Sequence, residues 1–257
     1  MIKLMPKIIC AFWAAGILLS SACGPKLPPE ERFLNNYQTG HELMLNRKYE
    51  RAIKHFRKAM KIQDSNPEVY RQMAVCFEKL NETDSAVVYY EGAIVFNPKD
   101  SDSYQRIGDI YYEQGDLHEA MTWYDRAKDL GYIQPRSYYR LGNVHYEWQR
   151  YEMAKQCYEF AIIADSTYAD AYYGLGKIEL AAGDTVKAEA NFHKAAEAYS
   201  HSNSYYMLGT LYYKQQDSDR ALKWFEAYLR LAPEGKYSLK AKDYRMKIML
   251  EKKAGRQ

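Results

Sequence analysis

Four cysteines and six histidines are the residues of this chain best suited to bind a metal ion or to act as nucleophiles. No two histidines form a His-x-x-x-His pair, and none lies beside a cysteine or a run of carboxylates at the spacing that a zinc site requires. The pair Gly174-x-Gly176 lacks a third glycine and follows no expected strand, so it indicates helix packing rather than a phosphate-binding loop. No Walker motif or nucleophile elbow occurs in the sequence. We therefore expect no catalytic residue, no metal and no cofactor.

Cys23 is the cysteine with a recognisable chemical context. Lys3 and Lys7 precede an apolar run from Ile8 to Leu19, which is too short for a permanent membrane span, and the small residues Ser20-Ser21-Ala22 follow. Residues 1–22 therefore have the features of an export signal. A cysteine directly after such a signal resembles the bacterial lipoprotein box, although Ser20 stands where leucine is commonest.

The resemblance implies that residues 1–22 are removed and that Cys23 becomes the lipidated first residue of the mature protein. Gly24 follows where some lipoproteins carry aspartate as an inner-membrane signal, so we expect an outer-membrane anchor facing the periplasm. Several acyl chains would hold the protein on the membrane. Residues 23–32, rich in proline, are expected to be a short extended tether. The alternative is ordinary signal cleavage, which would leave Cys23 as a free thiol.

Tyrosine is the unusual entry in the composition, with 26 residues, and many occur as adjacent pairs. Neighbouring residues on a helix point about 100° apart, so one member of each pair can pack inward while the other faces a different direction. Tyrosine offers a large contact area and an orienting hydroxyl at small entropic cost, which suits peptide recognition. The pairs are Tyr111-Tyr112, Tyr138-Tyr139, Tyr172-Tyr173, Tyr205-Tyr206 and Tyr212-Tyr213.

The elements that must position these tyrosines repeat along the chain. Between residues 101 and 134 the pattern is aromatic-x-x-(Leu/Ile/Met)-(Gly/Ala)-x-x-aromatic, then a turn at Gly115-Asp116, then Ala120, Tyr124 and Ala127 at helical spacing. This pattern returns about every 34 residues and resembles the tetratricopeptide repeat (TPR). The resemblance implies an all-α, right-handed α-solenoid of about six helix-turn-helix repeats.

The repeats are expected at residues 33–66, 67–100, 101–134, 135–168, 169–201 and 202–235, followed by a capping helix and tail at 236–257. The first repeat matches least well, as terminal repeats of such arrays often do. In the final helix, Leu239, Ala241, Tyr244, Ile248 and Met249 are expected near one face. Cys76 and Cys157 lie two repeats apart, beyond disulfide reach, and are expected to be buried thiols. His145 occupies a core-facing position, where a hydrogen-bonded structural histidine is expected.

In TPR proteins the first helix of each repeat lines a concave groove. The resemblance therefore implies a partner-binding groove formed by Tyr112, Tyr139, Asn143, Tyr146, Tyr173, Lys177, Tyr206 and Tyr213. Tyr138 and Tyr172 are expected to fill the core instead. The alternative interpretation is that the tyrosines reflect only the consensus of the scaffold. Of the residues used by TPRs that clamp a terminal carboxylate, only Asn143 is present, because Asp109 occupies the equivalent place one repeat earlier.

Charge is distributed unevenly along the chain. Residues 31–61 carry a net charge of +5, residues 64–129 carry −8, and the tail from residue 234 carries +5. The formal charge of +3 falls to +1 when Lys3 and Lys7 are removed with the signal, so nucleic-acid binding is not expected. The segregation is compatible with simple solvation. It is also compatible with a basic, membrane-proximal first repeat next to an acidic docking surface.

These observations favour a non-enzymatic, membrane-tethered scaffold that binds envelope proteins or peptides in the concave groove. A lipid-anchored protein of this length with six TPRs also resembles the pilotins of type IV pili, which escort a secretin to the outer membrane. A third hypothesis is binding of cell-wall glycans by the tyrosines.

Overall fold

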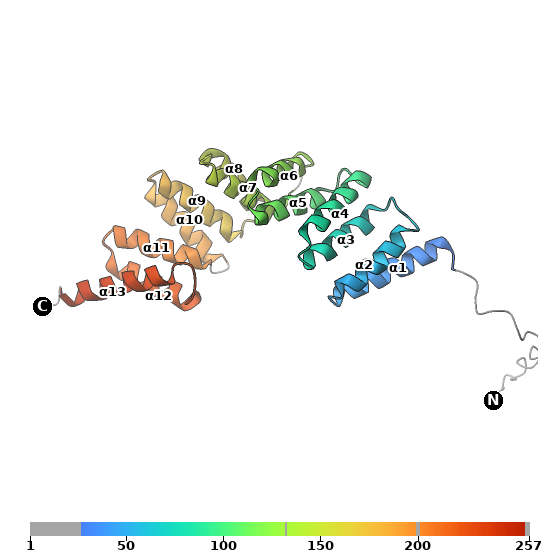
Figure 1. Ribbon diagram of the computed structural model, residues 1–257. Helices are drawn as coiled ribbons and strands as arrows, with labels where there is room; N and C mark the ends of the chain where they lie inside the picture. Colours follow the sequence, from blue (N-terminus) through green and yellow to red (C-terminus); the bar gives the residue numbers. More distant parts are fainter. Residues whose placement is uncertain (1–26, 132, 199–200, 255–257) are drawn as a thin grey trace, which may run out of the picture.

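The computed structural model describes residues 27–131, 133–198 and 201–254. Thirteen α-helices and no strand occur in these residues, and Figure 1 shows them stacked in pairs along an open arc. The helices are α1 (Pro29–Leu45), α2 (Tyr49–Met60), α3 (Pro67–Lys79), α4 (Thr83–Phe96), α5 (Ser101–Gln114), α6 (Leu117–Asp129), α7 (Pro135–Glu147), α8 (Tyr151–Ala164), α9 (Ala169–Ala181), α10 (Thr185–Glu197), α11 (Ser202–Lys214), α12 (Ser218–Leu231) and α13 (Ser238–Ala254). The expected all-α solenoid is confirmed.

The turn inside each helix pair has a fixed backbone geometry. One residue in each turn has a positive φ, between 57° and 85°, and these residues recur every 33 or 34 positions: Arg47, Asn81, Gly115, Gln149, Gly183 and Gln216. Only glycine adopts this left-handed region at little cost. The periodicity of the sequence is therefore also a periodicity of the backbone.

Close helix pairing depends on a small residue opposite an aromatic ring. Glycines on the first helices face a Phe or Tyr 16 residues later on the second helix, as in Gly108 with Tyr124 and Gly176 with Phe192. A Cβ atom at either glycine would come within 2.5–2.8 Å of the ring. Tyr158 is enclosed on both sides, because Gly142 of its own repeat and Gly174 of the next both face its ring. Gly174 and Gly176 are thus packing residues, as expected.

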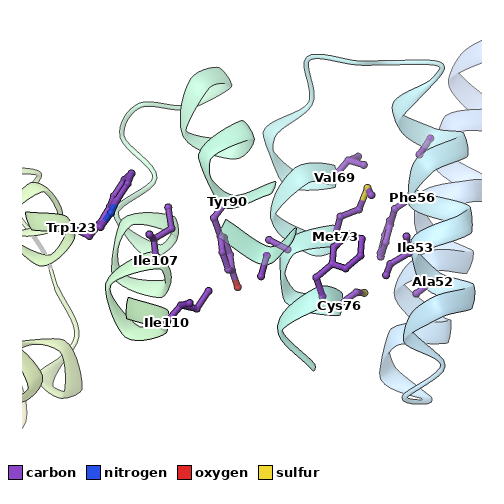
Figure 2. Packing of buried hydrophobic residues seen from close by; sticks show 14 residues of the cluster. Ala52, Ile53, Phe56, Val69, Met73, Cys76, Tyr90, Ile107, Ile110 and Trp123 are labelled. Atoms are coloured by element: carbon purple, nitrogen blue, oxygen red, sulfur yellow. The ribbon is translucent and has the colours of Figure 1, made fainter. Parts of the chain in front are cut away.

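The buried core forms clusters that each extend across neighbouring repeats. Figure 2 shows the buried side chains of the N-terminal half in a line that starts at Ala52 on α2, passes Met73 on α3 and Tyr90 on α4, and ends at Trp123 on α6. Each repeat buries its apolar face only against its neighbours, which is how a solenoid obtains stability. Cys76 and Cys157 are both buried free thiols, and burial raises the pKa of each to about 12.

Three local expectations require correction. Helix α1 begins at Pro29, so the end of the expected extended tether is helical, because proline fits the first position of a helix and Glu30 and Glu31 favour its N-terminus. In α13, Ala241 and Ile248 are buried, whereas Leu239 and Met249 are exposed. Leu239 lies about 200° around the helix from Ala241, and Met249 about 100° from Ile248, so neither shares the buried stripe.

The third correction concerns the expected core histidine. His145 is buried on α7, as expected. Its Nδ1 atom, however, has no hydrogen-bond partner among the described residues, so the expected hydrogen bonding of this ring is not found there. Burial lowers the pKa of His145 below the usual 6.5.

Candidate binding site on the concave face

The first helices form the inner layer of the arc. Helix α7 contacts both α5 and α9 directly, while the second helices pack behind their own first helices. The eight side chains expected to form the groove all come from α5, α7, α9 and α11. The structure does not bring them into one continuous surface.

The middle of the concave face is closed by a set of mutually bonded polar side chains, which we call the central network: Asp109, Tyr112, Glu113, Tyr124, Arg140, Asn143 and Tyr158. Arg140 is the hub, because its guanidinium lies 2.8 Å from a carboxylate oxygen of Asp109 and 2.8 Å from one of Glu113. The Tyr124 hydroxyl donates a hydrogen bond to Asp109 at 2.6 Å. The adjacent carboxylates keep the pKa of Arg140 above its usual value despite its burial.

Two of the expected groove residues belong to this network. The amide Nδ2 of Asn143 donates to the Tyr112 hydroxyl at 3.1 Å, and the Tyr158 hydroxyl donates to Asn143 Oδ1 at 2.8 Å. Asn143 therefore uses its amide to join α5, α7 and α8. Tyr139 lies beside it, with its ring 5.7 Å from that of Tyr158, and burial raises its pKa to about 12.

Farther along the arc, a cleft of about 440 Å³ opens between α7, α9, α11 and the segment before α13. We call it the C-terminal cleft; its lining residues are Tyr146, Tyr173, Lys177, Leu180, Ala181, Asn203, Met207, Lys236 and Tyr237. Three expected groove residues, Tyr146, Tyr173 and Lys177, meet here. Asn203, Met207, Lys236 and Tyr237 were not identified from the sequence.

Lys177 lies at the centre of this cleft. Its Nζ atom is 3.8 Å from the centroid of the Tyr146 ring and 5.8 Å from that of Tyr173, a cation–π arrangement. Burial lowers the pKa of Lys177; the Glu147 carboxylate opposes this effect, and Lys236 adds to it. No carboxylate is among the nine lining residues, and Lys177 forms no ion pair within the described residues. The cleft therefore presents two cationic groups, aromatic rings and apolar side chains.

The expected facing is wrong for the pairs Tyr172-Tyr173 on α9 and Tyr205-Tyr206 on α11. Tyr173 and Tyr206, expected on the open surface, are 9% and 7% exposed. Their rings lie against Phe192 and Phe225, each 19 residues later and each with centroids 5.9 Å apart. Tyr206 also stacks on Tyr237 at 4.3 Å. Tyr173 therefore lines the cleft with only the small exposed part of its side chain. Tyr206 does not line the cleft, but it packs against the lining residue Tyr237.

Tyr138 and Tyr172, which were expected to fill the core, do not, whereas Tyr212 is a buried first member of its pair. Tyr138 and Tyr172 are only half-buried: Tyr138 packs on the exposed Phe160, and the Tyr172 hydroxyl donates to the Ser166 carbonyl. Tyr213 lies outside the cleft, with its ring 4.9 Å from that of Tyr244 on α13. The roles of the eight expected groove residues in partner binding remain predictions.

The anchor lies outside the part of the structure that can be described. Cys23 precedes residue 27, the first described residue. Within residues 27–254, apart from the undescribed positions, no helix is long and apolar enough to cross a membrane.

Comparison with family models identifies the repeats. A model described as TPR repeat matches residues 108–149, and models described as tetratricopeptide repeat match residues 35–66, 89–122, 135–166 and 167–234. Together they cover more than half of the chain. No curated protein matches the chain.

Solved structures share the fold at low sequence identity. The Pseudomonas aeruginosa PilF structure has a TM-score of 0.70 at 20% identity, covering 84% of this chain and 98% of the other. PilW, described as a widely conserved type IV pilus biogenesis factor, has a TM-score of 0.64 at 15% identity, covering 81% and 97%. YrrB, described as a TPR protein with an unusual peptide-binding site, has a TM-score of 0.60 at 21% identity, covering 73% and 97%. With its 34-residue backbone period and its matches to four repeat models, the chain belongs to the tetratricopeptide repeat family.

Proposed function

We propose that this protein is a non-enzymatic scaffold that holds a segment of an envelope protein in the C-terminal cleft. The observation that carries the proposal is that Lys177 and Lys236 line the same cleft, and that no carboxylate is among its lining residues. A partner segment that brings a carboxylate would supply the missing charge. Desolvated charge pairs at such sites contribute strongly to specificity.

The remaining cleft residues suit an extended peptide. Tyr146 and Tyr237 offer rings on which side chains can stack, and Met207 is a flexible apolar surface that adapts to different partners. The Tyr237 ring is held in place because it stacks on the ring of Tyr206. A cleft whose walls are already packed loses little entropy on binding.

Blocking the cleft tests this function. Asn203→Arg introduces a long side chain at a half-buried lining position, while Gln156→Arg introduces the same side chain at an exposed site on α8. Partners would be captured in cells by cross-linking and quantified by mass spectrometry against the wild type. Asn203→Arg should remove the specific partner and Gln156→Arg should not. Equal capture by both variants would overturn the assignment of the cleft.

The second part of the proposal is attachment to a bacterial outer membrane through lipidated Cys23. The support is the export signal and the small residues before Cys23. Cys23→Ser should release the protein into the soluble envelope fraction or leave it unprocessed. A variant of mature size that still fractionates with the membrane would contradict the lipid anchor.

A more specific candidate is a role in type IV pilus assembly, as a pilotin-like factor for a secretin. The favouring observation is that the PilF and PilW structures superpose over more than four fifths of this chain. Deletion of the gene should then abolish surface pili and reduce secretin multimers in the outer membrane. Normal pili and multimers in the deletion strain would eliminate this candidate and leave the general scaffold proposal intact.

A further inference from the structure

The N-terminal end of the arc carries a concentrated basic surface. Helix α2, the turn before it and the residue that follows it hold seven lysines and arginines against one acidic residue, Glu50. We call this set the α2 basic face: Arg47, Lys48, Arg51, Lys54, Arg57, Lys58 and Lys61. All seven side chains are exposed.

These charges are unpaired. No ion pair within the described residues includes any member of the α2 basic face, and the first ion pair along that part of the chain joins Glu68 and Arg71. Some basic side chains farther along the chain do have partners, such as Arg106 with Glu78. Seven like charges without counter-charges repel one another, so an external polyanion is the natural complement.

The basic face is also hollowed. A cleft of about 700 Å³ between α1 and α2 is lined by Arg51, Lys54, Arg57, Lys58 and Lys61 together with Thr39, Leu43 and His55. A second cleft of about 520 Å³ shares Lys58 and Lys61 and extends to Arg32 and Pro29. Positive charge therefore continues from α2 to Arg32, near the start of α1.

The position of this face along the chain indicates what it meets. Cys23 precedes Pro29 by six residues, which can span at most about 20 Å. Helix α13, the other basic element, lies at the opposite end of the arc in Figure 1, and its Lys252 is paired with Asp219. A membrane holding Cys23 would thus lie within reach of the α2 basic face and far from α13.

We propose that the α2 basic face docks on the anionic phospholipid headgroups of the membrane that anchors the chain, and so fixes how the solenoid stands on it. The clefts take headgroup phosphates, and the exposed lysines and arginines around them take the surface charge. Juxtamembrane basic residues contribute about 1 kcal/mol each, close to a five-fold change in affinity. The inference rests on the tether proposed for Cys23 and is independent of the C-terminal cleft.

The test measures lysine accessibility on vesicles. The full chain purified from envelopes is mixed with vesicles of phosphatidylcholine alone, or of phosphatidylcholine mixed with the anionic lipid phosphatidylglycerol. Acetylation rates at Lys54, Lys58 and Lys61 are read by mass spectrometry, with the exposed Lys240 and Lys242 of α13 as internal references. On anionic vesicles the three α2 lysines should react about five-fold more slowly, and high salt should abolish the difference.

A matched pair of variants gives the control. Arg51→Glu/Arg57→Glu reverses two charges on the α2 basic face, and Arg230→Glu/Arg245→Glu reverses two exposed charges near the other end. Only the first pair should remove the protection of Lys54, Lys58 and Lys61.

Each possible result decides the matter. Equal acetylation on neutral and anionic vesicles overturns the inference, and so does failure to bind either vesicle. Binding to both vesicles without added protection leaves the lipid anchor standing and removes only the docking. Protection seen on native envelope membranes but not on anionic lipid vesicles would assign the face to an acidic protein instead.

Discussion

The central network and the C-terminal cleft both combine tyrosines, an asparagine and a cationic side chain from first helices, yet one is closed and the other open. In the network, the cation of Arg140 is held between Asp109 and Glu113. In the cleft, Lys177 faces aromatic rings and a second lysine. The difference shows that a repeated scaffold does not repeat its polar contacts, because the side chains of the network bond to one another, whereas no carboxylate lines the cleft around Lys177.

The largest expected effect is on the network. Arg140→Ala leaves Asp109 partly buried without its counter-charge, and breaking such a pair costs about 3–5 kcal/mol. Arg136→Ala is the matched control, because Arg136 reaches the same Glu113 at 3.5 Å but is half exposed, and it should cost less than about 1 kcal/mol. Urea unfolding measures both. Equal, small losses would show that the network does not hold the middle of the array together.

The next effect probes the junction between the two regions. Tyr158 bonds to Asn143 of the network and packs against Gly174 of α9. In Gly174→Ala the new Cβ would lie 2.6 Å from the ring of Tyr158, and overpacking of this kind costs about 1–3 kcal/mol. In the double variant with Tyr158→Leu, the loss should be smaller than the sum of the two single losses. Strict additivity in thermal melts would contradict the contact.

A smaller, pH-dependent effect on the free energy of unfolding is expected from His145 on α7. Burial lowers the pKa of His145 in the folded state, so the unfolded chain binds the proton first as the pH falls. As the pH falls below about 6.5, His145 therefore lowers the free energy of unfolding, and this loss stops growing once the pH is below the folded pKa. Well above the unfolded pKa, His145 has no such effect. His145→Phe should be less destabilised than the wild type between pH 8 and pH 5.5 in urea unfolding. An unchanged pH dependence would mean that His145 is protonated without cost.

The smallest effect on stability should accompany a large effect on binding. Lys177→Ala removes a cation–π contact but also a desolvated charge, so the unfolding free energy should change by less than about 1 kcal/mol. Partner capture should nevertheless be lost. Lys194→Ala is the control, since Lys194 lies over Tyr172 at 5.3 Å on α10, outside the cleft. Loss of capture in both variants, or in neither, would remove the contrast between network and cleft.

The repeat array could be predicted because its signals are local. Small residues opposite aromatic rings recur in the sequence about every 34 residues, and the left-handed turns recur in the backbone with nearly the same period. The facing of the tyrosine pairs could not be read from helical geometry alone, since it depends on the ring 19 residues later, as with Tyr173 and Phe192. That spacing was present in the sequence and could have corrected the assignment.

The missing members of the cleft depend on longer-range packing. Lys236 and Tyr237 follow α12, and they reach the concave face only because the segment before α13 returns across α11 and stacks on Tyr206. Arg140 was missed for a related reason. Its partners Asp109 and Glu113 lie on the preceding repeat, a pairing that no single repeat reveals.

The most direct measurement of the central claim is site-specific photo-cross-linking in cells. A benzophenone amino acid is placed at Met207, which lines the C-terminal cleft, and in parallel at Glu226, which is exposed on α12. The account predicts a discrete cross-linked partner from position 207 that disappears when Lys177→Ala is added, and no such product from position 226. The same product from position 226, or a product from position 207 that persists in the Lys177→Ala variant, would contradict it.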